Sequence, residues 1–111
     1  SVTGVQTCAL PIWNFHESLR EVSTDIKEGA DMIIVKPGMP YLDIIRSIKD
    51  KFKIPVIAYQ VSGEYSLIKN GINKNIIDEK SIIESLYSFK RAGANAIITY
   101  FADSINLDLL D

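Results

Sequence analysis

The sequence predicts an α/β fold in which amphipathic helices alternate with short, buried, parallel strands. Segments with apolar residues at helical spacing are each followed by a run of four or five apolar residues, which is the pattern of βα units. Two of these runs follow similar helix ends, at residues 28–31 and 92–95, each with a glycine suited to a left-handed helix cap. This internal similarity fits a closed barrel as well as an open doubly wound sheet.

The first half of the chain is expected to contain a helix, a strand and a second helix. Apolar residues recur every three or four positions over residues 17–28 and again over 41–52, so both segments are predicted to be amphipathic helices. Between them, residues 32–35 form a continuous apolar run, which is typical of a strand buried on both faces. Lys36 and the Pro-Gly pair after it end this strand.

The second half continues the alternation. In order, we expect a strand at 56–59, a turn at 62–64, a short helix at 65–69, a polar connection at 71–75, a helix ending at Arg91 and a strand at 96–100. Asp78 or Ser81 is expected to cap the last helix. Three strands with helices outside them leave exposed sheet edges, so the chain is expected to be part of a larger fold.

Length, composition and charge exclude several classes of protein. The 111 residues fall well short of the roughly 250 that a complete (β/α)8 barrel needs. A hydrophobic content of 47% and a charged content of 23% indicate a globular domain rather than a disordered chain. The net charge of -2 without a basic stripe excludes a nucleic-acid partner, and no apolar run approaches the roughly 20 residues of a membrane span.

The amino-terminal segment, residues 1–13, is treated separately. Residues 2–12 match the forward translation of a widely used sequencing-library adapter. We therefore expect residues 1–13 to be an artefact of assembly, with the native protein starting near Asn14; a native extended segment is the alternative. Cys8, the only cysteine, then says nothing about the redox compartment.

Candidate catalytic residues follow the predicted strands, because the carboxyl ends of parallel strands form the active face of α/β folds. Lys36 ends the first strand. Burial disfavours a charged ammonium group, and a neutral lysine amine can attack a ketone to give a Schiff base. The alternative is that the Lys36 side chain merely extends to water at the strand end.

Two hydroxyl groups are expected near this lysine. Ser62 and the backbone N–H groups after it could bind a substrate carboxylate, or Ser62 could simply cap a helix. Tyr100 could donate its O–H to the same carboxylate, or be a core tyrosine with a structural hydrogen bond. Glu21 is a lone acid on the helix predicted at 17–28, and His16 lies near its start with no second metal ligand at a suitable spacing. Their pattern alone indicates surface positions for both.

Three segments resemble those of a known enzyme family, the porphobilinogen synthases (5-aminolevulinate dehydratases). They are residues 29–43 (GADMIIVKPGMPYLD), 58–65 (AYQVSGEY) and 89–101 (FKRAGANAIITYF). The resemblance extends from Asn14 to about Leu110, with the segments in the family's order and spacing. It implies that residues 14–111 are the C-terminal portion of a (β/α)8 TIM barrel, about its last three βα units.

The resemblance also implies an activity. Members of the family condense two 5-aminolevulinate molecules to porphobilinogen, with loss of two waters, in heme and chlorophyll biosynthesis. They form homo-oligomers, usually octamers, in the cytoplasm or in plastids. The fragment alone is expected to be inactive, because the family's other Schiff-base lysine, its carboxylate-binding arginines and its metal-binding loop all precede Asn14.

Individual roles follow from the same resemblance. Lys36 matches the lysine that forms a Schiff base with the second substrate, and Ser62 and Tyr100 match the pair that holds its carboxylate. Glu21 matches a glutamate of an allosteric magnesium site at a subunit interface, while zinc in the parent enzyme would use ligands that this chain lacks. Another Schiff-base barrel enzyme, such as a class I aldolase, and a non-catalytic module are the alternatives.

Overall fold

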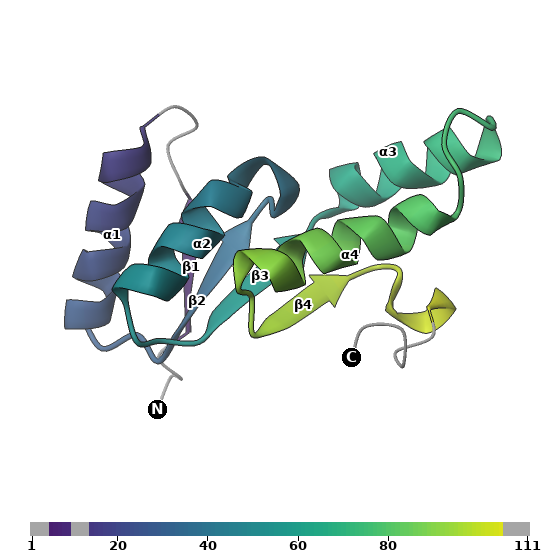
Figure 1. The fold of residues 1–111 in the computed structure, drawn as a ribbon. Coiled ribbons are helices and arrows are strands. Elements are labelled where there is room, and N and C mark those ends of the chain that lie inside the picture. The colour runs from purple at the N-terminus through teal and green to yellow at the C-terminus, as the bar shows by residue number, and fades with distance from the viewer. Residues whose placement is uncertain (1–4, 10–13, 106–111) are drawn as a thin grey trace.

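The computed structural model describes residues 5–9 and 14–105, which form one parallel sheet and the helices that pack on it. The strands are β1 (Val5–Ala9), β2 (Met32–Lys36), β3 (Val56–Gln60) and β4 (Ala96–Thr99). They pair in the order in which they occur in the chain (Figure 1). Every neighbouring pair is parallel.

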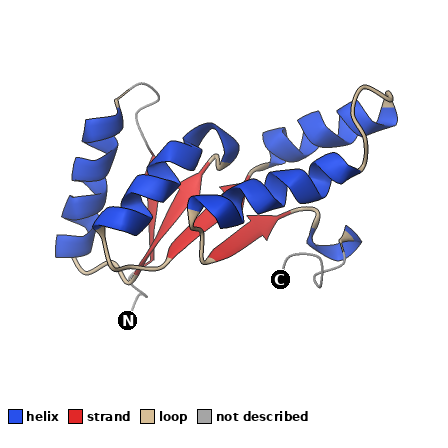
Figure 2. Ribbon diagram, in the orientation of Figure 1, coloured by secondary structure: helices blue, strands red, loops and turns tan. Residues whose placement is uncertain are grey.

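The helices connect these strands. They are α1 (Phe15–Lys27), the short 3-10 helix η1 (Met39–Tyr41), α2 (Leu42–Lys51), α3 (Ser62–Asn73), α4 (Lys80–Ala92) and a final 3-10 turn η2 (Ala102–Ser104). Figure 2 shows α1, α2 and α4 lying side by side over one face of the sheet. The connection between β3 and β4 contains both α3 and α4.

The core lies between this face of the sheet and the helices. Alternate strand residues, Ile33 and Val35 on β2 and Val56 and Ala58 on β3, are fully buried. Their helical partners include Val22 on α1, Ile45 and Ile48 on α2, and Leu86 and Phe89 on α4. Residues on the opposite face are less covered, and Ile98 on β4 is 42% exposed.

The strand order and the one-sided helix layer together identify the architecture. A doubly wound sheet carries helices on both faces and reverses its strand order at a switch point. Here consecutive strands are neighbours and the helices of the connections cover a single face, as expected when right-handed βα units follow one another around a barrel. The described residues therefore form a segment of a barrel wall, and the uncovered face is its interior.

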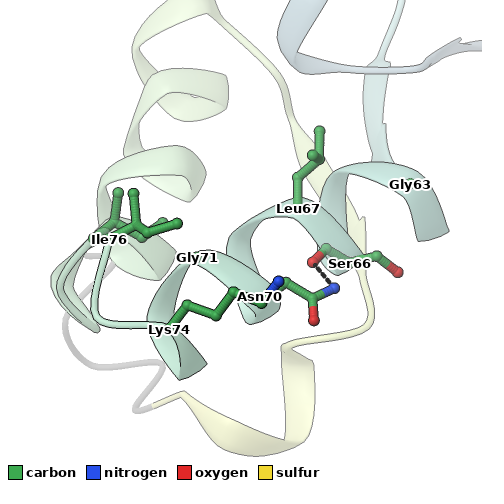
Figure 3. Close-up of a pocket in the computed structure, with 8 residues that line it drawn as sticks. Gly63, Ser66, Leu67, Asn70, Gly71, Lys74 and Ile76 are labelled. Carbon is green, nitrogen blue, oxygen red and sulfur yellow. Dashed lines mark hydrogen bonds between the residues drawn. The ribbon is translucent and has the colours of Figure 1, made fainter.

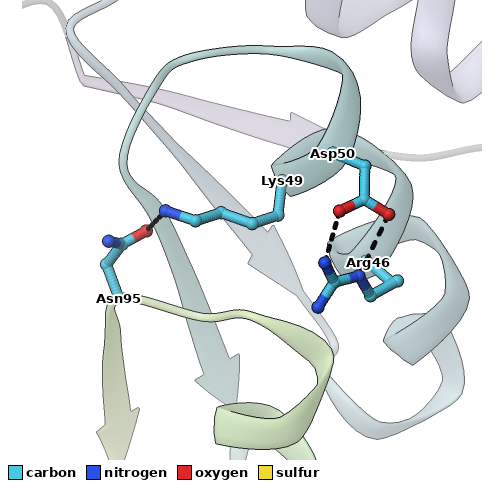
Figure 4. A network of polar contacts seen from close by, with 4 residues as sticks. All are labelled: Arg46, Lys49, Asp50 and Asn95. Carbon is cyan, nitrogen blue, oxygen red and sulfur yellow. Dashed lines mark hydrogen bonds and ion pairs between the residues drawn. The ribbon is translucent and has the colours of Figure 1, made fainter.

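Polar side chains join the elements at the amino ends of the strands. The Asn95 side-chain oxygen accepts hydrogen bonds from the backbone N–H of Val56, at 3.0 Å, and from Nζ of Lys49, at 2.9 Å. On the surface of α2, Arg46 and Asp50 form an exposed ion pair one helical turn apart. Figure 4 shows the Lys49–Asn95 contact and the Arg46–Asp50 pair, of which only the first connects different elements.

The predicted strands are confirmed to within one residue at each end, whereas three predictions about local structure are wrong. The turn expected at 62–64, the short helix at 65–69 and the first part of the polar connection at 71–75 are one helix, α3, that begins at Ser62 and ends at Asn73. Its start is stabilised by the Glu64 carboxylate, which accepts the backbone N–H of Val61 at 2.9 Å. Of the two candidate caps for α4, Asp78 accepts the N–H of Lys80 at 2.8 Å.

The strand β1 was not expected from the sequence. It lies within residues 1–13 and pairs with β2 in a register that places Ala9 beside Lys36. A short segment without side-chain periodicity can pair with an open strand edge through its backbone alone. The structure leaves the origin of residues 1–13 untested, so an adapter-derived segment stays a prediction.

Candidate active site

The three residues predicted to bind or activate substrate lie at the same edge of the sheet. Lys36 is the exposed last residue of β2. Ser62 is exposed and begins α3, two residues beyond the end of β3. Tyr100 follows β4 directly and is 57% exposed. The topology thus brings a primary amine and two hydroxyl groups to the carboxyl ends of three adjacent strands.

The backbone after Lys36 is packed closely against α4. The Lys36–Pro37 peptide bond is cis. A side chain at Gly38 would place its Cβ 2.4 Å from Cε1 of Phe89, and 3.2 Å from the backbone oxygen of Tyr59. Only glycine leaves room for this approach, which brings the loop that follows Lys36 against the core.

Glu64 fixes the same loop from the other side. Its carboxylate accepts the backbone N–H of Gly38 at 3.2 Å and that of Met39 at 2.6 Å, in addition to that of Val61. The side chain is buried, with 9% of its surface exposed. This role of Glu64 is not predicted from the sequence, because nothing in the Ser-Gly-Glu segment indicates contacts with residues 25 or 26 positions earlier.

Two further tyrosines surround Tyr100. Hydrogen bonding with Tyr59 raises the pKa of Tyr100 above its ordinary value. The ring of Tyr65 lies 5.6 Å from that of Tyr100 and 4.6 Å from that of Phe101, measured between ring centres. The alternation of side chains along a strand places Tyr59 on the same sheet face as Lys36, a signal that was present in the sequence.

A buried polar network supports the ends of β3 and β4. Gln60 is fully buried, donates to Oγ of Ser85 at 2.9 Å and accepts from Oγ1 of Thr99 at 2.6 Å. Thr99 in turn accepts the backbone N–H of Phe101 at 3.1 Å. Because Tyr100 lies between Thr99 and Phe101, this network fixes the backbone on both sides of it.

The helix α1 offers no complete metal site. Glu21 is half-buried on this helix and His16 is exposed, with its ring edge-on to Phe15. Among residues 5–9 and 14–105, no three His, Cys, Asp or Glu side chains lie together in a way that could hold a metal ion. Glu21 could supply one carboxylate ligand only, so the predicted magnesium site would need ligands from elsewhere.

A separate hollow of about 470 Å³ lies along α3 (Figure 3). Its lining is mainly apolar and includes Leu67, Ile76 and Ile77, together with Asn70 and Lys74. None of the predicted site residues lines it.

In the part of the chain that the structure describes, no helix is long and apolar enough to cross a membrane.

Comparisons with known proteins agree with this arrangement. A family model described as delta-aminolevulinic acid dehydratase matches residues 4–107. The chain is 60% identical over 92 residues to the delta-aminolevulinic acid dehydratase of Methanothermus sociabilis, covering 83% of this chain and 29% of that protein. It is 57% identical over 90 residues to the chloroplastic enzyme 1 of Arabidopsis thaliana, covering 80% of this chain and 21% of that protein.

A solved structure shows the same fold. The delta-aminolevulinic acid dehydratase (porphobilinogen synthase) of Toxoplasma gondii, in complex with the reaction product porphobilinogen, superposes with a TM-score of 0.82 at 48% identity. The match covers 86% of this chain and 27% of that one. The chain thus spans less than a third of the length of these relatives.

Proposed function

The chain belongs to the delta-aminolevulinic acid dehydratase family, and on that premise we propose that it forms the carboxy-terminal part of a porphobilinogen synthase. The complete enzyme would condense two molecules of 5-aminolevulinate to porphobilinogen with loss of two waters. The observation that carries the proposal is the position of Lys36, exposed at the carboxyl end of β2 and beside the loop that Glu64 fixes.

In the proposed reaction Lys36 supplies the amine that binds a substrate ketone. Its neutral Nζ attacks the carbonyl carbon and forms a C–N bond, one proton is taken up from solvent, and the former carbonyl oxygen leaves as water to give a protonated Schiff base. The positive nitrogen then withdraws electrons from the neighbouring carbons and favours loss of a proton from one of them. The C–N bond to Lys36 breaks again when the product leaves, which restores the amine.

The hydroxyl groups of Ser62 and Tyr100 would hold the carboxylate of that substrate. A carboxylate accepts hydrogen bonds, so both hydroxyls must act as donors. A phenol with the ordinary pKa of about 10 keeps its proton in the neutral range, so Tyr100 can donate, and hydrogen bonding with Tyr59 shifts its pKa further upward. On substrate binding, the Tyr100 O–H would turn from Tyr59 to the carboxylate.

Three further elements of the proposal concern the complete protein. A homo-oligomer, an octamer in the family, would bring other surfaces to α1, where Glu21 could contribute one oxygen ligand to an allosteric Mg²⁺. Zinc in the parent would have to be bound by residues upstream of Asn14. A cytoplasmic or plastid location is supported by relatives that include chloroplastic enzymes.

The test uses a complete enzyme. Residues 14–105 would replace the matching segment of the Methanothermus sociabilis protein, to which the chain is 60% identical, and borohydride would trap Schiff bases formed with 5-aminolevulinate. We expect an adduct on Lys36, loss of porphobilinogen formation in Lys36→Met, and full activity in the control Lys69→Met, an exposed lysine on α3.

Three outcomes would contradict the proposal. The first is the absence of an adduct on Lys36 in an active chimaera, and the second is an adduct formed only with aldol substrates. The third is porphobilinogen formation by the isolated chain, which spans less than a third of the length of its relatives.

A further inference from the structure

We propose that Glu64 is a positioning residue for the Schiff-base chemistry, acting on Lys36 through the backbone of the loop that follows it. This inference rests on the proposed function and extends it to a residue that touches no substrate. Glu64 lies near the start of α3, in a different βα unit from Lys36.

The geometry is that of one carboxylate joining two chain segments. Oε1 of Glu64 accepts the N–H of Met39 at 2.6 Å, and Oε2 accepts those of Gly38 at 3.2 Å and Val61 at 2.9 Å. The first two donors lie two and three residues after Lys36, and the third immediately precedes Ser62. The same side chain therefore fixes the backbone beside the reactive amine and the backbone beside the carboxylate-binding hydroxyl.

The buried charge of Glu64 suits this function. Hydrogen bonds from N–H groups to an ionised carboxylate are stronger than those between neutral groups. The amino end of α3 adds a favourable helix dipole. A glutamine at this position would have nearly the same shape, but one of its two terminal atoms would be an NH₂ group facing backbone N–H donors. At least one of the three contacts would then be lost.

Gly38 lies so close to Phe89 that an added Cβ would overlap its ring, so the loop has little room to move toward α4 once the Glu64 contacts are released. Displacement of a reacting group by about 1 Å can reduce a rate about 100-fold. Loss of the hydrogen bonds to Glu64 is therefore expected to slow attack by Lys36 rather than to weaken binding elsewhere in the barrel.

The experiment uses the same complete chimaera, with Glu64→Gln as the test variant. The readout is the rate of borohydride-trapped 5-aminolevulinate adduct at Lys36, compared by peptide mass spectrometry with the rate at the upstream Schiff-base lysine of the same protein. We expect Glu64→Gln to slow adduct formation at Lys36 by about 10- to 100-fold and to leave the upstream lysine unchanged. Glu84→Gln, which alters an exposed glutamate on α4, should change neither rate.

Glu64→Asp keeps the charge, so its rate of adduct formation at Lys36 should lie between those of Glu64→Gln and the unsubstituted chimaera. If the glutamine variant does not fold, Glu64→Asp serves as the test variant. Equal adduct rates at Lys36 with and without the substitution would overturn the inference. A proportional fall at both lysines would also overturn it, because that result indicates general destabilisation. If the unsubstituted chimaera forms no adduct at Lys36 at all, the proposed function fails and this inference with it.

Discussion

Tyr59 and Tyr100 lie on the same barrel-facing surface, and hydrogen bonding with Tyr59 raises the pKa of Tyr100 above its ordinary value. The register of β3 and β4 pairs Tyr59 with Ile98, so Tyr100 lies two residues beyond this pair on the same side of the sheet. The pKa of the proposed carboxylate donor thus depends on a residue of the neighbouring strand.

Tyr59→Phe should lower the pKa of Tyr100 toward its ordinary value of about 10, since the hydrogen bond that stabilises the neutral phenol is lost. A pKa raised in the folded state adds stability below the unfolded pKa, and this stability disappears as pH rises through the folded pKa. NMR titration of ring-labelled tyrosines measures the shift. Tyr87→Phe, on the exposed surface of α4, is the control, and an unchanged Tyr100 pKa in Tyr59→Phe would show that the bond has no effect.

Gly38→Ala should reduce the free energy of unfolding by about 1–3 kcal/mol, the usual cost of overfilling a packed site. The added Cβ would lie 2.4 Å from a ring carbon of Phe89, whose side chain is fully buried among core residues. Gly63→Ala is the matched control, because no atom lies within 4 Å of its added Cβ. Denaturant unfolding measures both, and equal stabilities would contradict the close approach of Gly38 to Phe89.

Much of this architecture was predictable from local patterns. Continuous apolar runs identified β2, β3 and β4, and the glycine at Gly93, with a φ of 111°, ended α4 as expected. These features depend on a few neighbouring residues. The start of α3 was missed because it depends on the Glu64 carboxylate folding back onto Val61.

The site was predictable only in part, for a similar reason. Lys36, Ser62 and Tyr100 could be placed at one edge because parallel strands bring their carboxyl ends together. The residues that hold them, Glu64 and Gln60, act on partners 25 to 39 positions away. No sequence period records such contacts, so their roles emerged only from the folded chain.

Gln60→Leu should lower the free energy of unfolding by about 1–3 kcal/mol, because it leaves the Thr99 hydroxyl without its buried acceptor. Gln60 also donates to Ser85, so the change removes two hydrogen bonds at once. Asn70→Leu makes the same amide-to-alkyl change at an exposed position and should have an effect within about 0.5 kcal/mol. Thermal unfolding of both variants measures the difference, and similar losses would argue against the network.

Arg46→Met should raise the pKa of Asp50, which its hydrogen bond to Arg46 holds below the ordinary value of about 3.9. A lowered folded pKa adds stability above the unfolded pKa, and that stability is lost as pH falls through the folded value. The pair is exposed, so the effect should shrink in high salt. NMR titration of Asp50 tests this, with Lys53→Met as the control that removes a charge but not the hydrogen bond.

Ile98→Lys should lower the free energy of unfolding of the complete chimaera much more than that of the isolated chain. Ile98 lies on the uncovered face of β4 and is 42% exposed, so lysine at this position should change the stability of the isolated chain by no more than about 0.5 kcal/mol. In a closed barrel the same face is interior, and an unpaired buried charge should cost about 3 kcal/mol or more.

The control for this comparison is Val56→Lys, on the helix-covered face. Val56 is fully buried in the chain as it stands, so this substitution should destabilise the isolated chain and the chimaera alike. Thermal unfolding of the four proteins provides the measurement. If Ile98→Lys destabilises both contexts equally, β4 is already covered in the isolated chain; if it is harmless in both, the uncovered face does not become a barrel interior.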